Sequence, residues 1–271
     1  MDSPRKIAII GAGKMGEAII SGLLKSGAYP PQDILIFEIS QNRCQYVAQE
    51  YKVRITSDIN EAVNLAEVII IAVKPGVVGK VLESIKHSIQ PGKVLLSIAA
   101  GVTIEFLEKN LPKNTAVIRV MPNLACSVGE AMIVVCPSKN TGESELKIAT
   151  DVLSLLGKVL KLEEKYLNLA TGLVGSGPAY IFVIIDALAD AGVRLGLSKG
   201  VSTVLAAQTM LGAAKMVVET GKHPAQLKDM VATPAGTTVE GLLALEEGKL
   251  RATLISAVTE AAKRAKGLMS A

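Results

Sequence analysis

The chain has 271 residues, of which 49% are hydrophobic, and it carries a formal net charge of +4. Its length suits one large domain or two modest ones, and its scattered basic residues, without aromatic residues between them, argue against nucleic-acid binding. No apolar stretch of about 18 residues runs without a charge, and the N-terminus leads straight into a strand pattern, so we expect neither a membrane span nor a signal peptide. The mean hydropathy of +0.40 is high, which predicts burial against a second subunit.

The most informative motif follows the first apolar run, Lys6–Ile10, and has the form G-x-G-x-x-G. Gly11 would permit a tight turn, Gly13 would let the backbone approach a pyrophosphate, and Gly16 would let a helix pack close to the strand. The helical pattern Met15–Leu24 begins at once, and the free N–H groups at a helix start favour phosphate. The motif therefore predicts a dinucleotide-binding unit.

An acidic residue, Glu38, closes the next apolar run, Ile34–Phe37, about 22 residues after Gly16. An acid at this spacing accepts hydrogen bonds from a ribose 2′-OH, which favours NAD. Ser40 and Arg43 follow, and a hydroxyl with a guanidinium suits the 2′-phosphate of NADP. The alternative for Arg43 is a solvated position in the first turn of the next helix. The choice between the two cofactors stays open.

The first half of the chain alternates between strand and helix patterns, which predicts a mostly parallel, doubly wound sheet of the Rossmann type. Ligands of such sheets bind at the carboxyl ends of the strands, where we expect the turns Ala72–Pro75, Ser97–Gly101 and Met121–Asn123. The remaining strands are expected at Val53–Thr56, Val68–Val73, Val94–Ile98, Ala116–Val120, Ala131–Cys136 and Lys158–Leu162, and further helices at Val77–Ile89 and Glu143–Leu156.

After Leu162 the pattern contains no strand. The segment Tyr180–Leu188 is apolar on nearly every face, which in a small helical domain implies contact with a second subunit. Asp186 and Asp190, four residues apart on the helix expected at Ala179–Leu195, fit caps or interface partners better than acid–base catalysis. Helices are expected at Asn168–Val174, Ala179–Leu195, Lys199–Thr220, Pro224–Val231, Val239–Glu247 and Arg251–Leu268.

One segment of the C-terminal half, Ala232–Glu240, has two interpretations. Thr237 and Glu240 fit a capping box at the start of a helix. Alternatively, Gly236, Thr237 and Thr238 place backbone N–H groups and two hydroxyls at a helix start, which suits a substrate carboxylate.

Cysteine and histidine usage argues against a metal site. Cys44, Cys126 and Cys136 are widely spaced without a C-x-x-C pattern, which is typical of reduced packing residues in a cytoplasmic protein. His87 and His223 do not belong to a cluster with ligand spacing. The chemistry is therefore expected to need neither metal nor a histidine base.

Eight segments spread along essentially the whole chain carry a resemblance to a known family, namely Gly11–Gly16, Ala72–Pro75, Ser97–Gly101, Val120–Asn123, Thr171–Tyr180, His223–Pro224, Leu227–Asp229 and Thr233–Thr238. With them the chain resembles the pyrroline-5-carboxylate reductase family. The resemblance implies NAD(P)H-dependent reduction of a cyclic imine to L-proline, the last step of proline biosynthesis. It also implies a Rossmann domain over 1–163 and an all-helical dimerisation and substrate-binding domain over 164–271, in a homodimer that is often part of a larger ring.

The resemblance also implies roles for individual residues. Thr238 would hydrogen-bond the substrate ring nitrogen as the catalytic residue, Gly236 and Thr237 would hold the carboxylate, and Glu164 and Ser176 would complete the substrate site. The chain departs from the family at Ala235, where a second glycine is common, at Leu124-Ala125, which replaces Thr-Pro, and at Met230. The implied cofactor site comprises Gly11, Ala12, Gly13, Lys14, Met15, Gly16, Glu38, Ser40, Arg43, Ala72, Val73, Lys74, Pro75, Ala99, Ala100 and Asn123.

Three alternatives share the N-terminal features. A β-hydroxyacid dehydrogenase would carry a catalytic Lys-x-x-x-Asn on the first helix of its second domain, but Ser176–Asp190 contains no lysine. A deazaflavin-dependent NADP reductase would not need the Thr233–Thr238 segment. A non-catalytic dinucleotide-binding protein would keep the fold without turnover, and an assay with pyrroline-5-carboxylate separates it from the enzyme.

Overall fold

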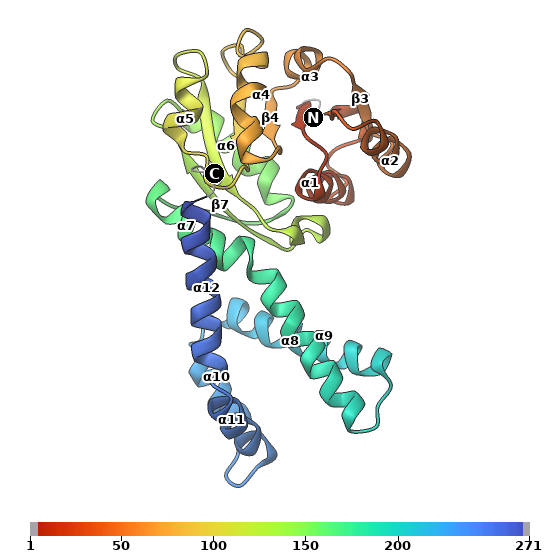
Figure 1. Ribbon diagram of the computed structural model, residues 1–271, viewed down its shortest axis with the longest axis vertical. Helices are drawn as coiled ribbons and strands as arrows, with labels where there is room; N and C mark the ends of the chain where they lie inside the picture. Colours follow the sequence, from red (N-terminus) through yellow and green to blue (C-terminus); the bar gives the residue numbers. More distant parts are fainter. Residues whose placement is uncertain (1–4, 268–271) are drawn as a thin grey trace. The chain divides into compact units, whose positions relative to one another are not determined.

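The computed structural model describes residues 5–267, which divide into two compact units (Figure 1). The first unit runs to Ser176 and takes in the chain from Thr259 onward, and the second comprises Gly177–Val258. Residues 164–176 belong to the first unit because Leu167 and Ala170 pack with Met121 and Val134 in a small hydrophobic cluster.

The first unit is built on one eight-stranded sheet with the order β3-β2-β1-β4-β5-β6-β7-β8. All neighbouring strands are parallel except β6 and β7, which are antiparallel. This confirms the predicted mostly parallel sheet, and each of the eight predicted strands is present. The strands are β1 Ile7–Ile10, β2 Ile34–Phe37, β3 Arg54–Thr56, β4 Val68–Ile71, β5 Val94–Ser97, β6 Ala116–Met121, β7 Ala131–Pro137 and β8 Gly157–Lys161.

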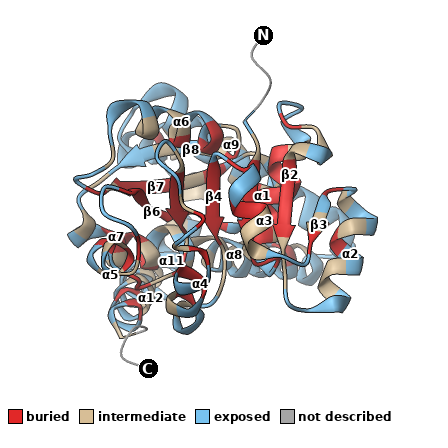
Figure 2. Cartoon of the chain, turned by 90° about the horizontal axis from the view of Figure 1, so that it is seen from above, coloured by how far each residue is buried: buried red, intermediate tan, exposed pale blue. Residues whose placement is uncertain are grey.

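Helices cover both faces of this sheet, and its inner strands, β1, β2 and β4 to β7, are largely buried between them, whereas the edge strands β3 and β8 are partly exposed (Figure 2). Ile7 and Ile9 of β1 face one helical layer, while Ala8 and Ile10 face the other, as the two-residue period of a strand requires. Burial on both faces explains why inner strands such as β1 and β4 are continuous apolar runs. The helices are α1 Lys14–Lys25, α2 Gln41–Tyr51, α3 Ile59–Leu65, α4 Val78–Ile85, α5 Ile104–Lys109, α6 Glu143–Ser154 and α7 Leu167–Ala170, followed by a π-helical turn, η5, over Thr171–Gly175.

The second unit is helical, and in the described part of the chain no strand follows β8. Lys199, at the start of α9, forms ion pairs of 2.6 Å with both Asp186 and Asp190 of α8. The two carboxylates are therefore held by an intrachain cation. The helices are α8 Gly177–Arg194, α9 Lys199–Thr220, α10 Pro224–Val231 and α11 Thr237–Glu247, and α12, Leu250–Lys266, continues from this unit into the first.

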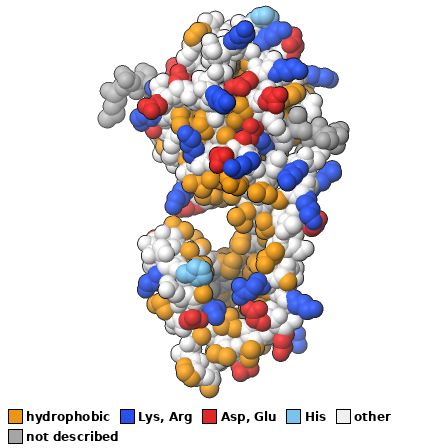
Figure 3. Space-filling view, turned by 90° about the vertical axis from the view of Figure 1, so that its left-hand side faces the viewer, with side chains coloured by type: hydrophobic (Ala, Val, Ile, Leu, Met, Phe, Trp, Pro, Cys, Tyr) orange, Lys and Arg blue, Asp and Glu red, His pale blue; other side chains and the backbone are white. Residues whose placement is uncertain are grey.

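Large apolar side chains remain exposed on the second unit, where Figure 3 shows them on the surface of its helices. Ala189 is the one buried residue of α8, and Ser202 and Ala206 are the two of α9. A helix that is apolar around most of its circumference requires a partner. The exposed residues include Phe182, Val183, Leu195, Val201, Val204, Leu205 and Val218.

Two segments of the described chain are long and apolar enough to cross a membrane, namely Glu164–Arg194 and Lys199–Thr220. Residues 166–185 carry no charged side chain, so the expectation that every apolar stretch of this length holds a charge is wrong here. Length and composition are weak evidence for a membrane span, because helices that pack in a soluble protein pass the same test.

Candidate functional site

The glycine loop follows β1 at the point where the sheet order reverses, because β1 pairs with both β2 and β4. Gly11 has a φ of +101°, and a Cβ atom there would lie 2.8 Å from the carbonyl oxygen of Ala72. A Cβ atom at Gly16 would collide with the carbonyl oxygen of Gly11. These contacts confirm the predicted tight turn and the close packing of helix on strand.

Gly13 differs from the other two glycines, because a Cβ atom there would meet no protein atom within 4 Å. Gly13 is the N-cap of α1 and offers no side chain to the free N–H groups of the first turn. Space above the backbone and unsatisfied donors at a helix start are what a pyrophosphate needs. The loop therefore fits a dinucleotide.

A pocket of about 350 Å³ lies beside this loop, at the carboxyl ends of β1, β2 and β4. Open α/β sheets bind their ligands at this kind of position. The structure thus brings together several of the predicted cofactor residues. The pocket is lined by Ile10, Gly11, Gly13, Phe37, Glu38, Ile39, Ala72, Val73, Lys74, Val77 and Val81.

Other predicted cofactor residues lie on the turns that follow the neighbouring strands. Pro75 begins a short 3-10 helix after β4, Ala99 and Ala100 follow β5, and Asn123 follows β6. Because β4, β5 and β6 are adjacent and parallel, these turns share one edge of the sheet. Asn123 is buried, and its side-chain oxygen accepts a hydrogen bond from the Ala125 N–H at 3.1 Å.

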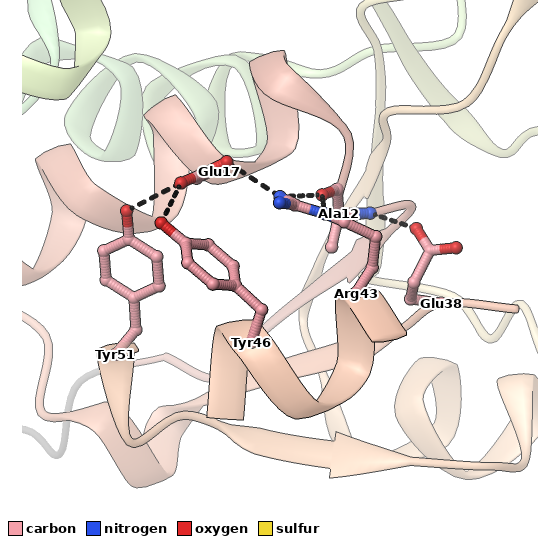
Figure 4. Close-up of polar contacts among 6 residues, drawn as sticks. All are labelled: Ala12, Glu17, Glu38, Arg43, Tyr46 and Tyr51. Atoms are coloured by element: carbon pink, nitrogen blue, oxygen red, sulfur yellow. Dashed lines mark hydrogen bonds and ion pairs between the residues drawn. The ribbon is translucent and has the colours of Figure 1, made fainter. Parts of the chain in front are cut away.

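Glu38 and Arg43 both contact the glycine loop (Figure 4). The Glu38 carboxylate accepts hydrogen bonds from the backbone N–H groups of Ala12, at 2.8 Å, and Ser40, at 2.9 Å. The Arg43 guanidinium donates to the Ala12 carbonyl oxygen at 3.0 and 2.6 Å and pairs with Glu17 at 2.7 Å. Arg43 does lie in the first turn of α2, as the alternative expected, but its guanidinium is paired with protein groups, so the expectation of a solvated side chain is wrong.

Glu17, in the first turn of α1, has several donors around its carboxylate. Tyr46 and Tyr51 of α2 donate to one oxygen at 3.0 and 3.1 Å, and Arg43 donates to the other. Burial raises the pKa of Glu17, but these hydrogen bonds outweigh burial and hold the pKa below its usual 4.5. Burial, together with the Glu17 charge, raises the pKa of Tyr51 to about 12. Sequence reasoning missed this cluster, because its members are separated along the chain.

We expect Glu17→Gln to lower the free energy of unfolding by about 1 kcal/mol at pH 7, the usual net value of a hydrogen bond. A carboxyl whose pKa is lowered by folding stabilises the protein above its unfolded pKa, and this stabilisation is lost as pH falls through the folded pKa. The deficit of the variant should therefore shrink below about pH 4.5. Urea unfolding at pH 7, 5 and 3.5 measures the difference in the free energy of unfolding between variant and wild type. Glu50→Gln, at an exposed residue, is the control. A pH-independent deficit would contradict the assignment.

Glu164, a predicted substrate residue, begins the turn before α7. One of its carboxylate oxygens accepts hydrogen bonds from the Ile104 N–H at 2.8 Å and from Arg119 at 3.0 Å. Arg119 is 2% exposed and also donates to Asn168 at 2.8 Å. Burying a guanidinium requires such partners. Sequence reasoning missed Arg119, although a single arginine within the apolar strand β6 was a usable signal.

The remaining predicted substrate residues divide between the two units. Ser176 lies at the end of the first unit, and Gly236, Thr237 and Thr238 lie in the second. Gly236 is the N-cap of α11, and no side chain caps this helix, so the predicted capping box of Thr237 with Glu240 is wrong. Among the described residues, the first N–H groups of α11 therefore have no side-chain acceptor, while the N–H of the N-cap Gly236 donates to the Thr233 carbonyl oxygen at 2.9 Å.

The capping box of this region lies one helix earlier, at the start of α10. The His223 side chain accepts a hydrogen bond from the Ala225 N–H at 3.2 Å, and the Gln226 side chain accepts one from the His223 N–H at 3.3 Å. An imidazole nitrogen here replaces the usual hydroxyl, which explains why the Ser/Thr pattern of a capping box did not find it.

Ala235 has a φ of +56°, a conformation that glycine adopts without strain. We expect Ala235→Gly to raise the free energy of unfolding by about 0.5–1 kcal/mol, because the relief of left-handed strain exceeds the entropy cost of glycine. Ala232→Gly is the matched control. Because Ala232 has a φ of −83°, which alanine adopts without strain, this variant should have a lower free energy of unfolding than the wild type. Equal losses in both variants, measured by denaturant unfolding, would refute the expectation.

The described residues contain no group of three or more His, Cys, Asp or Glu side chains placed to hold a metal. The three cysteines are free thiols, and Cys126 and Cys136 are buried. Burial raises the pKa of Cys126 to about 11, so this thiol is protonated at neutral pH.

Comparisons with known proteins cover nearly the whole chain. Residues 164–268 match the family model described as pyrroline-5-carboxylate reductase dimerisation, and residues 6–101 match that described as NADP oxidoreductase coenzyme F420-dependent. The pyrroline-5-carboxylate reductase of Methanosarcina acetivorans is 42% identical over 97% of this chain and 98% of its own, and that of Arabidopsis thaliana is 43% identical over 97% and 95%.

Solved structures agree with the sequence matches. The crystal structure of Plasmodium falciparum pyrroline carboxylate reductase with NADP bound has a TM-score of 0.89 and 31% identity, covering 98% of this chain and 99% of that one. The Coxiella burnetii pyrroline-5-carboxylate reductase has a TM-score of 0.87 and 34% identity, covering 98% of both. These relatives match the chain over its full length, which argues against the two alternative enzyme families, the β-hydroxyacid dehydrogenases and the deazaflavin-dependent NADP reductases. The chain belongs to the pyrroline-5-carboxylate reductase family.

Proposed function

We propose that this protein reduces the C=N bond of pyrroline-5-carboxylate with NAD(P)H and releases L-proline. The observation that carries the proposal is the full-length match to pyrroline-5-carboxylate reductases, in a chain whose glycine loop is shaped for a dinucleotide. We assign dinucleotide binding to residues 1–163, and substrate binding and dimerisation to residues 164–271.

We propose that the glycine loop, from Gly11 to Gly16 and including Ala12, Lys14 and Met15, holds the pyrophosphate, and that Glu38, Ser40 and Arg43 lie at the adenosine ribose. The turns containing Ala72–Pro75, Ala99, Ala100 and Asn123 would border the nicotinamide, because they follow adjacent parallel strands. The nicotinamide, when bound, supplies the hydride. The glycine loop itself contributes backbone donors and a preformed shape.

The substrate needs an anchor for its carboxylate and a hydrogen bond at its ring nitrogen. We propose that the loop at Gly236 and Thr237 binds the carboxylate at the start of α11, and that the Thr238 hydroxyl orients the nitrogen. The donor offered to the carboxylate is the Thr237 N–H, because the Gly236 N–H already donates to the Thr233 carbonyl oxygen at 2.9 Å. Glu164 and Ser176 would complete this site. An imine is already electrophilic, so positioning supplies much of the rate and neither metal nor histidine is required.

We further propose that the protein is a cytoplasmic homodimer whose exposed apolar helices face a second subunit. The dimerisation match over residues 164–268 supports this, as do the Lys199 ion pairs with Asp186 and Asp190, since charged side chains are costly inside a bilayer. We also propose that dimers assemble into a larger ring, which a mass above that of a dimer in light scattering would support.

The test is oxidation of NADH or NADPH, followed at 340 nm with pyrroline-5-carboxylate as substrate, together with detection of proline. One control omits the imine. Two others replace both the imine and the reduced dinucleotide, either with a β-hydroxyacid and NAD⁺ or with reduced deazaflavin and NADP⁺. Stoichiometric proline formation supports the proposal. A folded protein that binds dinucleotide but forms no proline would refute it and favour a non-catalytic dinucleotide-binding role.

A further inference from the structure

The peptide groups of Ala12, between the first two glycines of the loop, are held from two directions. The Ala12 N–H donates to the Glu38 carboxylate at 2.8 Å, and the Ala12 carbonyl oxygen accepts two hydrogen bonds from Arg43. Glu38 follows β2 and Arg43 lies in the first turn of α2, so both reach the loop from the segment after β2 (Figure 4). We call this arrangement the Ala12 clamp.

The charge of Arg43 is already compensated in the clamp. Its guanidinium pairs with Glu17 at 2.7 Å and lies 4.9 Å from the centre of the Tyr46 ring. The Arg43 side chain is 30% exposed and the Glu17 side chain 16%. If the guanidinium moved to a phosphate, the ion pair would break, and the Glu17 carboxylate would keep only its hydrogen bonds from the Tyr46 and Tyr51 hydroxyls. Arg43 is therefore a poor phosphate anchor.

The charge of Glu38, by contrast, faces the dinucleotide pocket. Glu38 lines this pocket, and each of its carboxylate oxygens accepts one backbone N–H, from Ala12 and from Ser40. These bonds fix the carboxylate while leaving lone pairs for further donors. A ribose 2′-OH can donate to such a group, whereas a 2′-phosphate is repelled by it.

We propose that Arg43 is a positioning residue, which shapes the glycine loop through Ala12 for either dinucleotide, and that Glu38 alone decides the 2′ position and favours NADH. This changes the role of Arg43 from a receiver of the 2′-phosphate to a support of the loop. The inference rests on the proposed dinucleotide site and is independent of the reductase activity, since it concerns binding of the free cofactor.

The test is calorimetric binding of NADH and NADPH to the full-length protein without imine. The wild type should bind NADH at least about tenfold more tightly than NADPH. Arg43→Met should raise the dissociation constants for NADH and NADPH by a similar factor of about five or more, so that the ratio of the two constants stays within about twofold of the wild-type ratio. Arg43→Lys should restore part of the lost affinity. Glu38→Gln should bring the ratio of the two dissociation constants close to one.

The matched control is Arg54→Met, which removes an exposed arginine paired with Glu61 in the same unit and should change neither affinity. Melting temperatures of all variants separate misfolding from loss of loop shape. A loss in Arg43→Met that is tenfold larger for NADPH than for NADH would overturn the proposal, as would tighter NADPH binding by the wild type. Cofactor binding without turnover would refute the proposed function while leaving this inference intact.

Discussion

Thr238→Ala is expected to lower kcat for pyrroline-5-carboxylate about tenfold to a thousandfold, the range that one positioned donor or proton-transfer group contributes. Thr238 is half-buried in the first turn of α11, and among the described residues its hydroxyl forms no intrachain hydrogen bond. It is therefore available to a ligand. Dinucleotide affinity should stay nearly unchanged, because the residues of the dinucleotide pocket all belong to the first unit.

Two comparisons sharpen this expectation. Thr238→Ser keeps the hydroxyl and should retain most of the activity, whereas loss in both variants would indicate a packing role for the methyl group. Steady-state kinetics with saturating cofactor, alongside calorimetric cofactor binding, separates kcat from affinity. Unaltered turnover in Thr238→Ala would remove this residue from the mechanism.

A double substitution in the second unit, Phe182→Asp with Val204→Asp, is expected to convert the dimer to monomers and to reduce activity about a hundredfold or more. Phe182 is 60% exposed and Val204 is 68% exposed within one chain. Unpaired carboxylates in an apolar interface carry a large desolvation cost. Activity should fall when the dimer dissociates, because the proposed substrate residues of α11 belong to the same unit as the exposed helices α8 and α9.

The matched control is Val128→Asp, since Val128 is an exposed apolar residue of the first unit with 62% exposure. This variant should remain dimeric and active. Light scattering coupled to gel filtration measures the mass, and circular dichroism checks the helices. A double variant that stays dimeric and fully active would show that α8 and α9 do not form the interface, and co-sedimentation of the wild type with lipid vesicles would favour a membrane instead.

The sequence by itself determined the order of the elements and the location of the dinucleotide loop. The inner strands are apolar runs because both sheet faces are covered there, and Gly11 and Gly16 stand where a Cβ atom would collide with backbone. Two C-terminal helices, Lys199–Thr220 and Pro224–Val231, were predicted with their observed bounds. These features depend on local periodicity and on backbone conformation, which neighbouring residues along the chain largely set.

Only the tertiary structure decided what the polar side chains do. Arg43 contacts Ala12, 31 residues away, and Arg119 contacts Glu164, 45 residues away. The start of α11 has no capping box, and the His223 box begins α10 instead. A charged side chain is placed by whichever partner the fold brings within about 3 Å, and no local pattern encodes a partner that the chain reaches only after folding.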